Sequence, residues 1–239
     1  SNPLSFCHEL FKDLPLKDVC KILFDLGYDG IELAPFMFHE DIRKMDPEEM
    51  RNILNIIDDE GLIVSGLHWL LASPKGLSIS SLDNEIRANT KSFFKSIIQF
   101  GAEMESDYLI FGSPNQRSLN PNDPEIAAKE YQQAINFFKE MADLAMESDM
   151  LIAFEPLGPQ TTNFGGTTED ALKIVKEVNH PGFTLMVDTS AIVREQKDPY
   201  SLIRSLKDQI DYVHLNDPNQ LGPGMGHMDF IPVFKALKE

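Results

Sequence analysis

The chain has 239 residues, of which 42% are hydrophobic and 25% are charged, and this composition excludes the disordered and fibrous classes of protein. A formal net charge of −17 opposes binding to a phosphate backbone, and no run approaches the roughly 18 apolar residues of a membrane helix, so we expect neither a nucleic acid nor a membrane as partner. The two cysteines are too few for a disulfide framework and favour a reducing compartment. We therefore expect a soluble, cytoplasmic protein.

Short apolar or β-branched runs alternate with longer amphipathic stretches along the whole chain, and this alternation predicts strands and helices in turn. Strands are predicted at residues 4–8, 30–34, 63–68, 108–112, 151–156, 184–188 and 212–216. Helices are predicted at 16–26, 47–60, 84–101, 124–148, 168–178, 199–207 and from 229 to the end. Three of these helices begin with an aspartate followed by proline, at Asp46, Asp123 and Asp198, which is a capping side chain before a residue fixed at helical φ.

Regular alternation of strand and helix predicts parallel strands joined by right-handed crossovers. An open doubly wound sheet would need a Gly-x-Gly-x-x-Gly turn after an early strand, and the only glycine-rich run, Gly222 to Gly226, follows the seventh strand with a different spacing. We therefore predict a single α/β domain over residues 1–239, a TIM (β/α)8 barrel. Only seven strands are found, so we expect the eighth strand to lie beyond Glu239 and to be missing from this sequence.

The active sites of such barrels lie at the carboxyl ends of the strands, and nearly every predicted strand ends in a polar residue. Three of these residues, Glu155, Asp188 and His214, each end an apolar run one strand–helix unit after the last. Because adjacent strands lie about 4.8 Å apart, the three side chains can converge on one point. Buried carboxylates at that separation repel one another unless a cation lies between them. Two carboxylates and one imidazole predict a divalent metal ion, either Mn²⁺, Mg²⁺, Co²⁺ or Zn²⁺.

Further rim residues are candidates for binding a small sugar or polyol substrate, and they are His8, Glu32, His68, Trp69, Arg117, Asn216 and His227. Each has a structural alternative. His68 and Trp69 form either a sugar-binding wall or a packed pair, and His227 either reaches the site or belongs to the start of the final helix. A solvated loop position suits Arg117 better than a phosphate or carboxylate site. For Glu32 we favour a hydrogen-bonding role slightly over direct catalysis.

Several motifs occur in a characteristic order, namely Leu151-Ile-Ala-Phe-Glu155-Pro, Met186-Val-Asp188-Thr, Tyr212-Val-His214-Leu-Asn-Asp217 and Gly222-Pro-Gly-Met-Gly226. Together with the first two strands they resemble the sugar phosphate isomerase/epimerase family of xylose isomerase-like TIM barrels, over essentially the whole chain. The resemblance implies that Glu155, Asp188 and His214 are metal ligands and that Glu155 is one of two catalytic glutamates. It places the second glutamate, which is also the fourth ligand, on the eighth strand.

The resemblance implies a metal-dependent isomerase or epimerase acting on a ketose or keto-sugar, with a glutamate moving a proton through an enediolate. Ketohexose 3-epimerases of the family place a substrate-binding histidine shortly after the metal aspartate, and the segment from Asp188 to Ala191 has none. The enzymatic alternative is an inosose-type dehydratase, and the non-enzymatic one is a sugar-binding barrel. A repair endonuclease of the endonuclease-four type needs more histidines than this chain offers. The sequence leaves the oligomeric state open, with a homo-oligomer as one option.

Overall fold

Seven parallel strands form one sheet in chain order in the computed structural model, which describes residues 2–219 and 221–239. The strands are β1 (Ser5–Cys7), β2 (Gly30–Leu33), β3 (Ile63–Leu67), β4 (Tyr108–Phe111), β5 (Leu151–Phe154), β6 (Phe183–Asp188) and β7 (Ile210–His214). Every neighbouring pair is parallel, from β1 with β2 to β6 with β7. All seven predicted strands are thus confirmed, to within a few residues at their ends.

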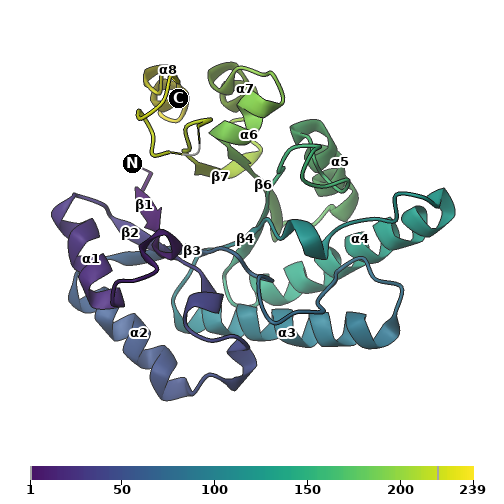
Figure 1. Ribbon diagram of the computed structural model, residues 1–239, viewed down its shortest axis with the longest axis horizontal. Coiled ribbons are helices and arrows are strands. Elements are labelled where there is room, and N and C mark those ends of the chain that lie inside the picture. Colours follow the sequence, from purple (N-terminus) through teal and green to yellow (C-terminus); the bar gives the residue numbers. More distant parts are fainter. Residues whose placement is uncertain (1, 220) are drawn as a thin grey trace.

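Helices surround the curved sheet in chain order, and Figure 1 shows them outside the ring of strands. They are α1 (Leu16–Asp25), α2 (Pro47–Asp59), α3 (Asn84–Glu103), α4 (Pro124–Met146), α5 (Thr168–Val178), α6 (Thr189–Arg194), α7 (Pro199–Ser205) and α8 (Ile231–Ala236). Four short 3-10 helices lie in the connections, at His8–Phe11, Pro35–Met37, Ile42–Lys44 and Pro114–Gln116. The predicted barrel architecture is confirmed, and the described residues contain no eighth strand. None of the described helices is long and apolar enough to cross a membrane.

The starts of the helices follow the predicted capping chemistry. Asp46 accepts a hydrogen bond from the backbone N–H of Glu48 and forms a capping box with Glu49 at the start of α2. Asp123 and Asp198 likewise accept backbone N–H groups at the starts of α4 and α7. These bonds satisfy donors that the first helical turn leaves without a partner, so the capping aspartates set where each helix begins.

Most of the hydrophobic core lies between the outer face of the sheet and the helices, as strand periodicity requires. Its centre is aromatic: the ring of Phe138 on α4 lies 4.9 Å from that of Phe111, 5.5 Å from that of Phe154 and 4.6 Å from that of Phe183, between centroids. A second, much smaller cluster of Ile110, Ala153 and Met186 fills the inside of the sheet. Side chains alternate along each strand between these two clusters.

The two ends of the sheet lie near each other. The side-chain amide of Asn2, just before β1, donates a hydrogen bond of 3.2 Å to the backbone carbonyl of Leu237, just after α8. Figure 1 shows the amino and carboxyl termini on the same side of the molecule, next to the gap between β1 and β7. Each of these strands has one strand partner in the described part of the chain.

Replacing Phe138 with alanine should lower the free energy of unfolding by about 3–5 kcal/mol, because the ring is fully buried among other aromatic rings. Urea unfolding followed by circular dichroism measures this difference. The matched control is Phe24→Ala on α1, whose side chain is 55% exposed and whose loss should cost less than about 1 kcal/mol. Equal losses in the two variants would contradict the position of the aromatic core.

Candidate metal and sugar site

The residues with reactive side chains lie on the inner face of the sheet, at the carboxyl ends of its strands. Ala153, Met186 and Tyr212 belong to the inner cluster, and side chains two positions later lie on the same face. Glu155, Asp188 and His214 are those later residues. Asp188 pairs with His214 in the register of β6 and β7, and the backbone N–H of Glu155 continues the ladder by donating to Phe111. The predicted trio therefore lies on one surface.

Two glutamates and two histidines on that surface contact one another in a closed cycle, which we call the ring, and its members are Glu32, His68, Glu155 and His214. Glu32 on β2 accepts a hydrogen bond of 2.8 Å on Oε2 from Nε2 of His214, and its Oε1 lies 3.1 Å from Nδ1 of His68. The remaining ring nitrogens face Glu155, with His68 Nε2 at 3.5 Å from Oε2 and His214 Nδ1 at 3.8 Å from Oε1. The two glutamates are 3% and 5% exposed. Four ionisable groups thus share one buried space.

Local backbone structure places Glu32 in this ring. The register between β2 and β3 shifts between Ile31 and Glu32, so that Ser65 has no partner residue on β2. Such irregularities redirect side chains and are common beside active sites. The hydroxyl of Tyr212 donates a hydrogen bond of 2.8 Å to Glu32 Oε2, and the hydroxyl of Ser65 lies 3.1 Å from that of Tyr212. The shift therefore brings the Glu32 carboxylate into a polar network.

The carboxylate of Glu155 occupies space that is open because residue 112 is a glycine without a side chain. A Cβ atom at Gly112, just after β4, would lie 2.7 Å from Oε2 of Glu155 and 3.7 Å from Nε2 of His68. The first distance is shorter than real side chains tolerate, so any larger residue at this position would displace the carboxylate. The end of β4 thus contributes room to the site, while β2, β3, β5 and β7 contribute side chains.

The charges in the ring stabilise one another. Burial alone would raise the pKa of Glu155, but the hydrogen bonds and charges of His214 and His68 outweigh it and hold that pKa below its usual range. Burial likewise disfavours the charged form of His214, yet the Glu32 and Glu155 carboxylates raise its pKa to about 10. The pKa of Glu32 is also lowered, by the same two histidines against the effect of burial. Both glutamates are therefore ionised at neutral pH.

The donor set suits a divalent cation. One ligand atom from each of His68, Glu155 and His214 lies within 4.8 Å of the others, with all three side chains largely buried. Metal–ligand bonds of about 2.0–2.2 Å put neighbouring ligand atoms roughly 3–3.6 Å apart, close to the two distances from Glu155 to the histidines. Nitrogen and carboxylate ligands accommodate Zn²⁺, Co²⁺ and Mn²⁺ alike.

Asp188 lies beside this ring with its carboxylate engaged. Oδ1 accepts backbone N–H groups from Ser190 at 2.7 Å and Ala191 at 3.1 Å, which caps α6, and Oδ2 accepts from the side-chain amide of Asn216. Burial and the charge of Glu155 raise the pKa of Asp188. A carboxylate oxygen has two acceptor directions, so these bonds leave room for a cation. The roles of Asp188 and Asn216 toward metal and substrate stay predictions.

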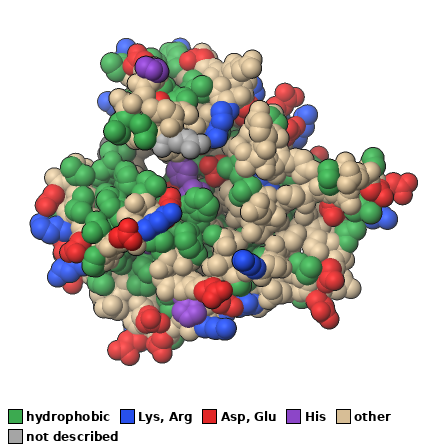
Figure 2. Space-filling view, viewed as in Figure 1, with side chains coloured by type: hydrophobic (Ala, Val, Ile, Leu, Met, Phe, Trp, Pro, Cys, Tyr) green, Lys and Arg blue, Asp and Glu red, His purple; other side chains and the backbone are tan. Residues whose placement is uncertain are grey.

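Trp69 directly follows His68, and the centroids of their two rings lie 5.6 Å apart. Its side chain is 43% exposed, and its ring packs edge-on against Phe36, with 6.2 Å between the centroids. Its backbone φ of 56° lies in the left-handed region, which costs free energy in a residue other than glycine. Figure 2 shows histidine side chains at the bottom of a hollow near the middle of this face of the molecule.

The prediction that Arg117 is a solvated loop residue is wrong. The side chain is fully buried, donates a hydrogen bond of 2.8 Å from Nη1 to the backbone carbonyl of Glu155, and its guanidinium carbon lies 4.7 Å from the centroid of the Phe154 ring. Burial lowers its pKa to about 9. The position follows from tertiary structure, because the loop after β4 folds beneath the end of β5, and no local sequence signal indicates this. Its predicted contact with substrate stays untested.

The remaining candidate histidines lie outside the ring. His8 is buried, accepts a hydrogen bond of 3.1 Å on Nδ1 from the backbone N–H of Ala34, and stacks on Phe38 with 4.9 Å between the ring centroids. His227 is exposed, and nearby Asp229 accepts the backbone N–H of Ile231 at the start of α8. These contacts hold the protein's own segments together. The predicted roles of His8 and His227 in substrate binding stay predictions.

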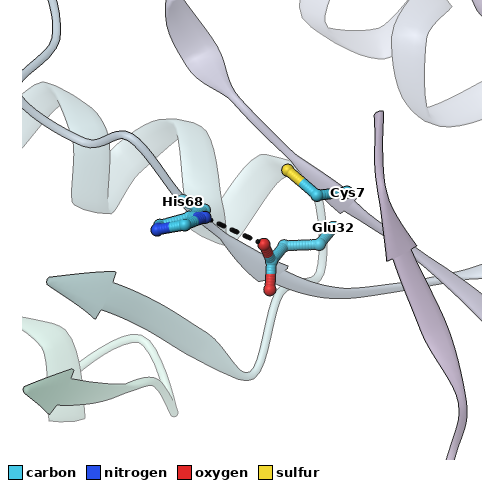
Figure 3. A group of neighbouring side chains, drawn as sticks. All are labelled: Cys7, Glu32 and His68. Carbon is cyan, nitrogen blue, oxygen red and sulfur yellow. Dashed lines mark ion pairs between the residues drawn. The ribbon is translucent and has the colours of Figure 1, made fainter. Parts of the chain in front are cut away.

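Two residues of the network were not found from the sequence. Cys7 on β1 lies next to Glu32 and His68, as Figure 3 shows, and burial raises the pKa of its thiol to about 11. Tyr212 bonds Glu32 from β7. The signal was present for Tyr212, because it lies two positions before His214 and must share its face of the strand. For Cys7, only the arrangement of β1 beside β2 brings the thiol to the site.

The chain belongs to the family described as "Xylose isomerase-like TIM barrel", whose model matches residues 20–239. This confirms the resemblance found from the motifs. Among curated proteins, the chain is 22% identical over 214 residues to a D-psicose 3-epimerase of Agrobacterium fabrum, covering 90% of this chain and 72% of that protein. Other relatives include a fructoselysine 3-epimerase of Shigella flexneri, 22% identical over 90% of this chain and 78% of that protein.

Solved structures show the same fold. A D-psicose 3-epimerase crystallised in the presence of D-fructose superposes with a TM-score of 0.84 at 20% identity, over 99% of this chain and 81% of that one. A probable 3-DHS dehydratase of Bacillus anthracis gives a TM-score of 0.74 at 17% identity, over 99% of this chain and 89% of that one. At these identities the likeness establishes the TIM-barrel fold and not the reaction.

Replacing His8 with asparagine should make the protein less sensitive to mild acid. Burial lowers the pKa of His8 to about 4 from an ordinary 6.5, so between these pH values the unfolded chain binds a proton that the folded chain does not. Folding stability from this residue is therefore lost as the pH falls from about 6.5 toward 4. Urea unfolding across this range should give a smaller slope of stability against pH for His8→Asn than for the wild type, and equal slopes would contradict the burial of a neutral His8.

Proposed function

We propose that the protein is a divalent-metal-dependent epimerase or isomerase of a ketose or keto-sugar. The observation that carries the proposal is the buried carboxylate of Glu155, ionised and facing two imidazoles at the carboxyl ends of the strands. The position agrees with where enzymes of this fold carry out their chemistry. Relatives named as 3-epimerases of ketoses and of fructoselysine support a sugar as the substrate class.

Glu155, Asp188 and His214 hold the metal in this proposal. When bound, the metal supplies Lewis acidity, which makes a proton on the carbon beside a carbonyl easier to remove. The side chains of Asp188 and His214 are held by neighbours that orient them, namely the start of α6 with Asn216 for Asp188 and Glu32 for His214. Pre-set ligands of this kind need little rearrangement on binding.

Glu155 takes the proton from the sugar carbon and leaves an enediolate. Its neighbours keep it ionised at neutral pH, as a base must be, and Arg117 holds its backbone carbonyl at 2.8 Å. A second acid–base group donates its own proton to the other face of the carbon, while Glu155 keeps the proton that it removed, and the family resemblance puts that second group on the eighth strand. The exposed ring of Trp69 gives the apolar face of a sugar a surface to lie against.

An inosose-type dehydratase is the second candidate. It begins with the same removal of a proton beside a carbonyl, and the likeness in fold to a probable dehydratase keeps it open. The two activities differ in the fate of the substrate hydroxyl, which an epimerase keeps and a dehydratase releases as water. Product mass therefore separates them. A non-catalytic sugar-binding barrel is the outcome if no carbon-bound proton exchanges at all.

Protein purified without chelator should contain about one divalent metal ion per chain, and Asp188→Ala should contain much less. The reason is that removing one of three ligands leaves fewer charged oxygens to hold the cation. Elemental analysis of both proteins measures the metal. The matched control is Asp198→Ala, which removes the capping aspartate of α7 away from the site and should keep its metal. Equal metal content in all three proteins would remove Asp188 from the ligand set.

Glu155→Gln should abolish exchange of the sugar proton while losing less metal than Asp188→Ala. The amide oxygen can still coordinate a cation, but an amide is not a base at neutral pH. The loss in rate is expected to be on the order of 10²–10⁴. Uptake of solvent deuterium into a panel of ketoses, followed by mass spectrometry, measures the exchange. Deuterium uptake that matches the wild type would exclude Glu155 as the base.

A further inference from the structure

The position of His68 suggests more than contact with a sugar. Its Nε2 lies 3.5 Å from Oε2 of Glu155, and the Nδ1 atom of His214 lies 3.8 Å from the other oxygen of the same carboxylate. Both separations are longer than a charge-assisted hydrogen bond, which is about 2.7–2.9 Å. They fit two nitrogens and a carboxylate that surround a common cation, and the two imidazole centroids are only 4.8 Å apart.

The opposite nitrogens of both histidines face a single carboxylate. Glu32 contacts Nδ1 of His68 with Oε1 and Nε2 of His214 with Oε2. Figure 3 shows the Glu32 carboxylate pointing toward the ring of His68. A carboxylate that accepts the outer N–H of a histidine fixes which ring nitrogen carries the proton and leaves the inner nitrogen free to bind a metal. Here one carboxylate faces the outer nitrogens of two imidazoles, through a hydrogen bond from His214 and an ion-pair contact of 3.1 Å with His68.

Charge supports the same arrangement. The buried ring contains two carboxylates, those of Glu32 and Glu155, which protonated imidazoles balance when no metal is bound. Imidazoles that bind a metal are neutral, and the two negative charges then need another partner. One divalent cation balances these charges, whereas buried charges without a partner are strongly unfavourable. A cation between Glu155, His68 and His214 would also lie on the side of the histidines away from Glu32.

We propose that His68 is a metal ligand through Nε2, together with Glu155 and His214, and that Glu32 is the positioning residue that holds both histidines in the metal-binding orientation. This inference rests on the proposed function, because it concerns the same metal. It adds a ligand from β3 to the set that was expected from β5, β6 and β7. His68 is thereby assigned to the metal instead of to the wall of the sugar pocket.

A different trio competes for the same imidazole. Ligand atoms of Cys7, Glu32 and His68 also lie within 4.8 Å of one another. A metal there would use a thiolate and would turn the Glu32 carboxylate from a positioning group into a ligand. Only the trio of His68, Glu155 and His214 uses the nitrogens of both imidazoles that face away from Glu32, while Nδ1 of His68 is already engaged by Glu32 at 3.1 Å, so we favour that trio.

The test uses the full chain, stripped with chelator and loaded with Co²⁺. X-ray absorption at the cobalt edge should detect two imidazole ligands and no sulfur in the unmodified protein. His68→Leu should reduce this to one imidazole and weaken Co²⁺ binding by at least about tenfold, measured by calorimetry. Glu32→Gln should weaken binding by about 10–100-fold and alter the visible spectrum of Co²⁺, because an amide cannot accept N–H groups on both ends. Cys7→Ser should change neither the affinity for Co²⁺ nor the visible spectrum of the bound Co²⁺.

The outcomes that overturn the inference are distinct from those that overturn the proposed function. A single imidazole in the unmodified protein, with deuterium uptake still dependent on Glu155, would exclude His68 as a ligand and leave the epimerase intact. Sulfur in the absorption spectrum would place the metal at Cys7 and also exclude the inference. Unchanged affinity and visible spectrum in Glu32→Gln would remove Glu32 as the positioning residue. If the unmodified protein binds no Co²⁺, both the inference and the proposed metal site are wrong.

Discussion

The buried carboxylate of Glu32 is the interaction on which the candidate site depends. A carboxylate that is only 3% exposed is strongly destabilising unless neighbouring groups bond to it. Tyr212 and His214 from β7 donate to it, and His68 at the end of β3 contacts its other oxygen. Strands that are distant in sequence must therefore hold their relative positions for the charge to be tolerated, and the register shift beside Glu32 is part of that arrangement. The buried charge of Glu32 and the relative positions of β2, β3 and β7 thus depend on each other.

Segments outside the sheet also hold the site residues Glu155 and Asp188 in position. Arg117 reaches the backbone of Glu155 from the loop after β4, and the start of α6 bonds the carboxylate of Asp188. Both contacts involve side chains or backbone that are buried or nearly so. Groups held from two sides lose little conformational freedom when a ligand arrives, which favours affinity and correct orientation. The network is therefore suited to chemistry that needs fixed positions, such as proton transfer at one carbon.

The periodicity of the sequence was enough to predict the seven strands, the order of the main helices and the inner-face positions of Glu155, Asp188 and His214. Local capping chemistry also gave the starts of α2, α4 and α7. It did not give α6, because the six residues Thr189–Arg194 are too short for a periodic pattern and their cap is Asp188, which had been assigned to the metal. The burial of Arg117 and the partners of Glu32 depend on contacts between distant segments, and no local rule contains that information.

The proposed function assigns substrate recognition and proton transfer to different parts of the molecule. The ring of Glu32, His68, Glu155 and His214 lies in or directly after strands, where the backbone ladder allows little variation. Trp69 lies instead on the loop after β3, is exposed to solvent and keeps a backbone conformation that costs free energy, as residues at ligand sites often do. In TIM barrels, loops vary while the strands persist, which is how one scaffold serves many substrates. The proposed function therefore assigns proton transfer to residues at the strand ends and the choice of sugar to the loops that follow them.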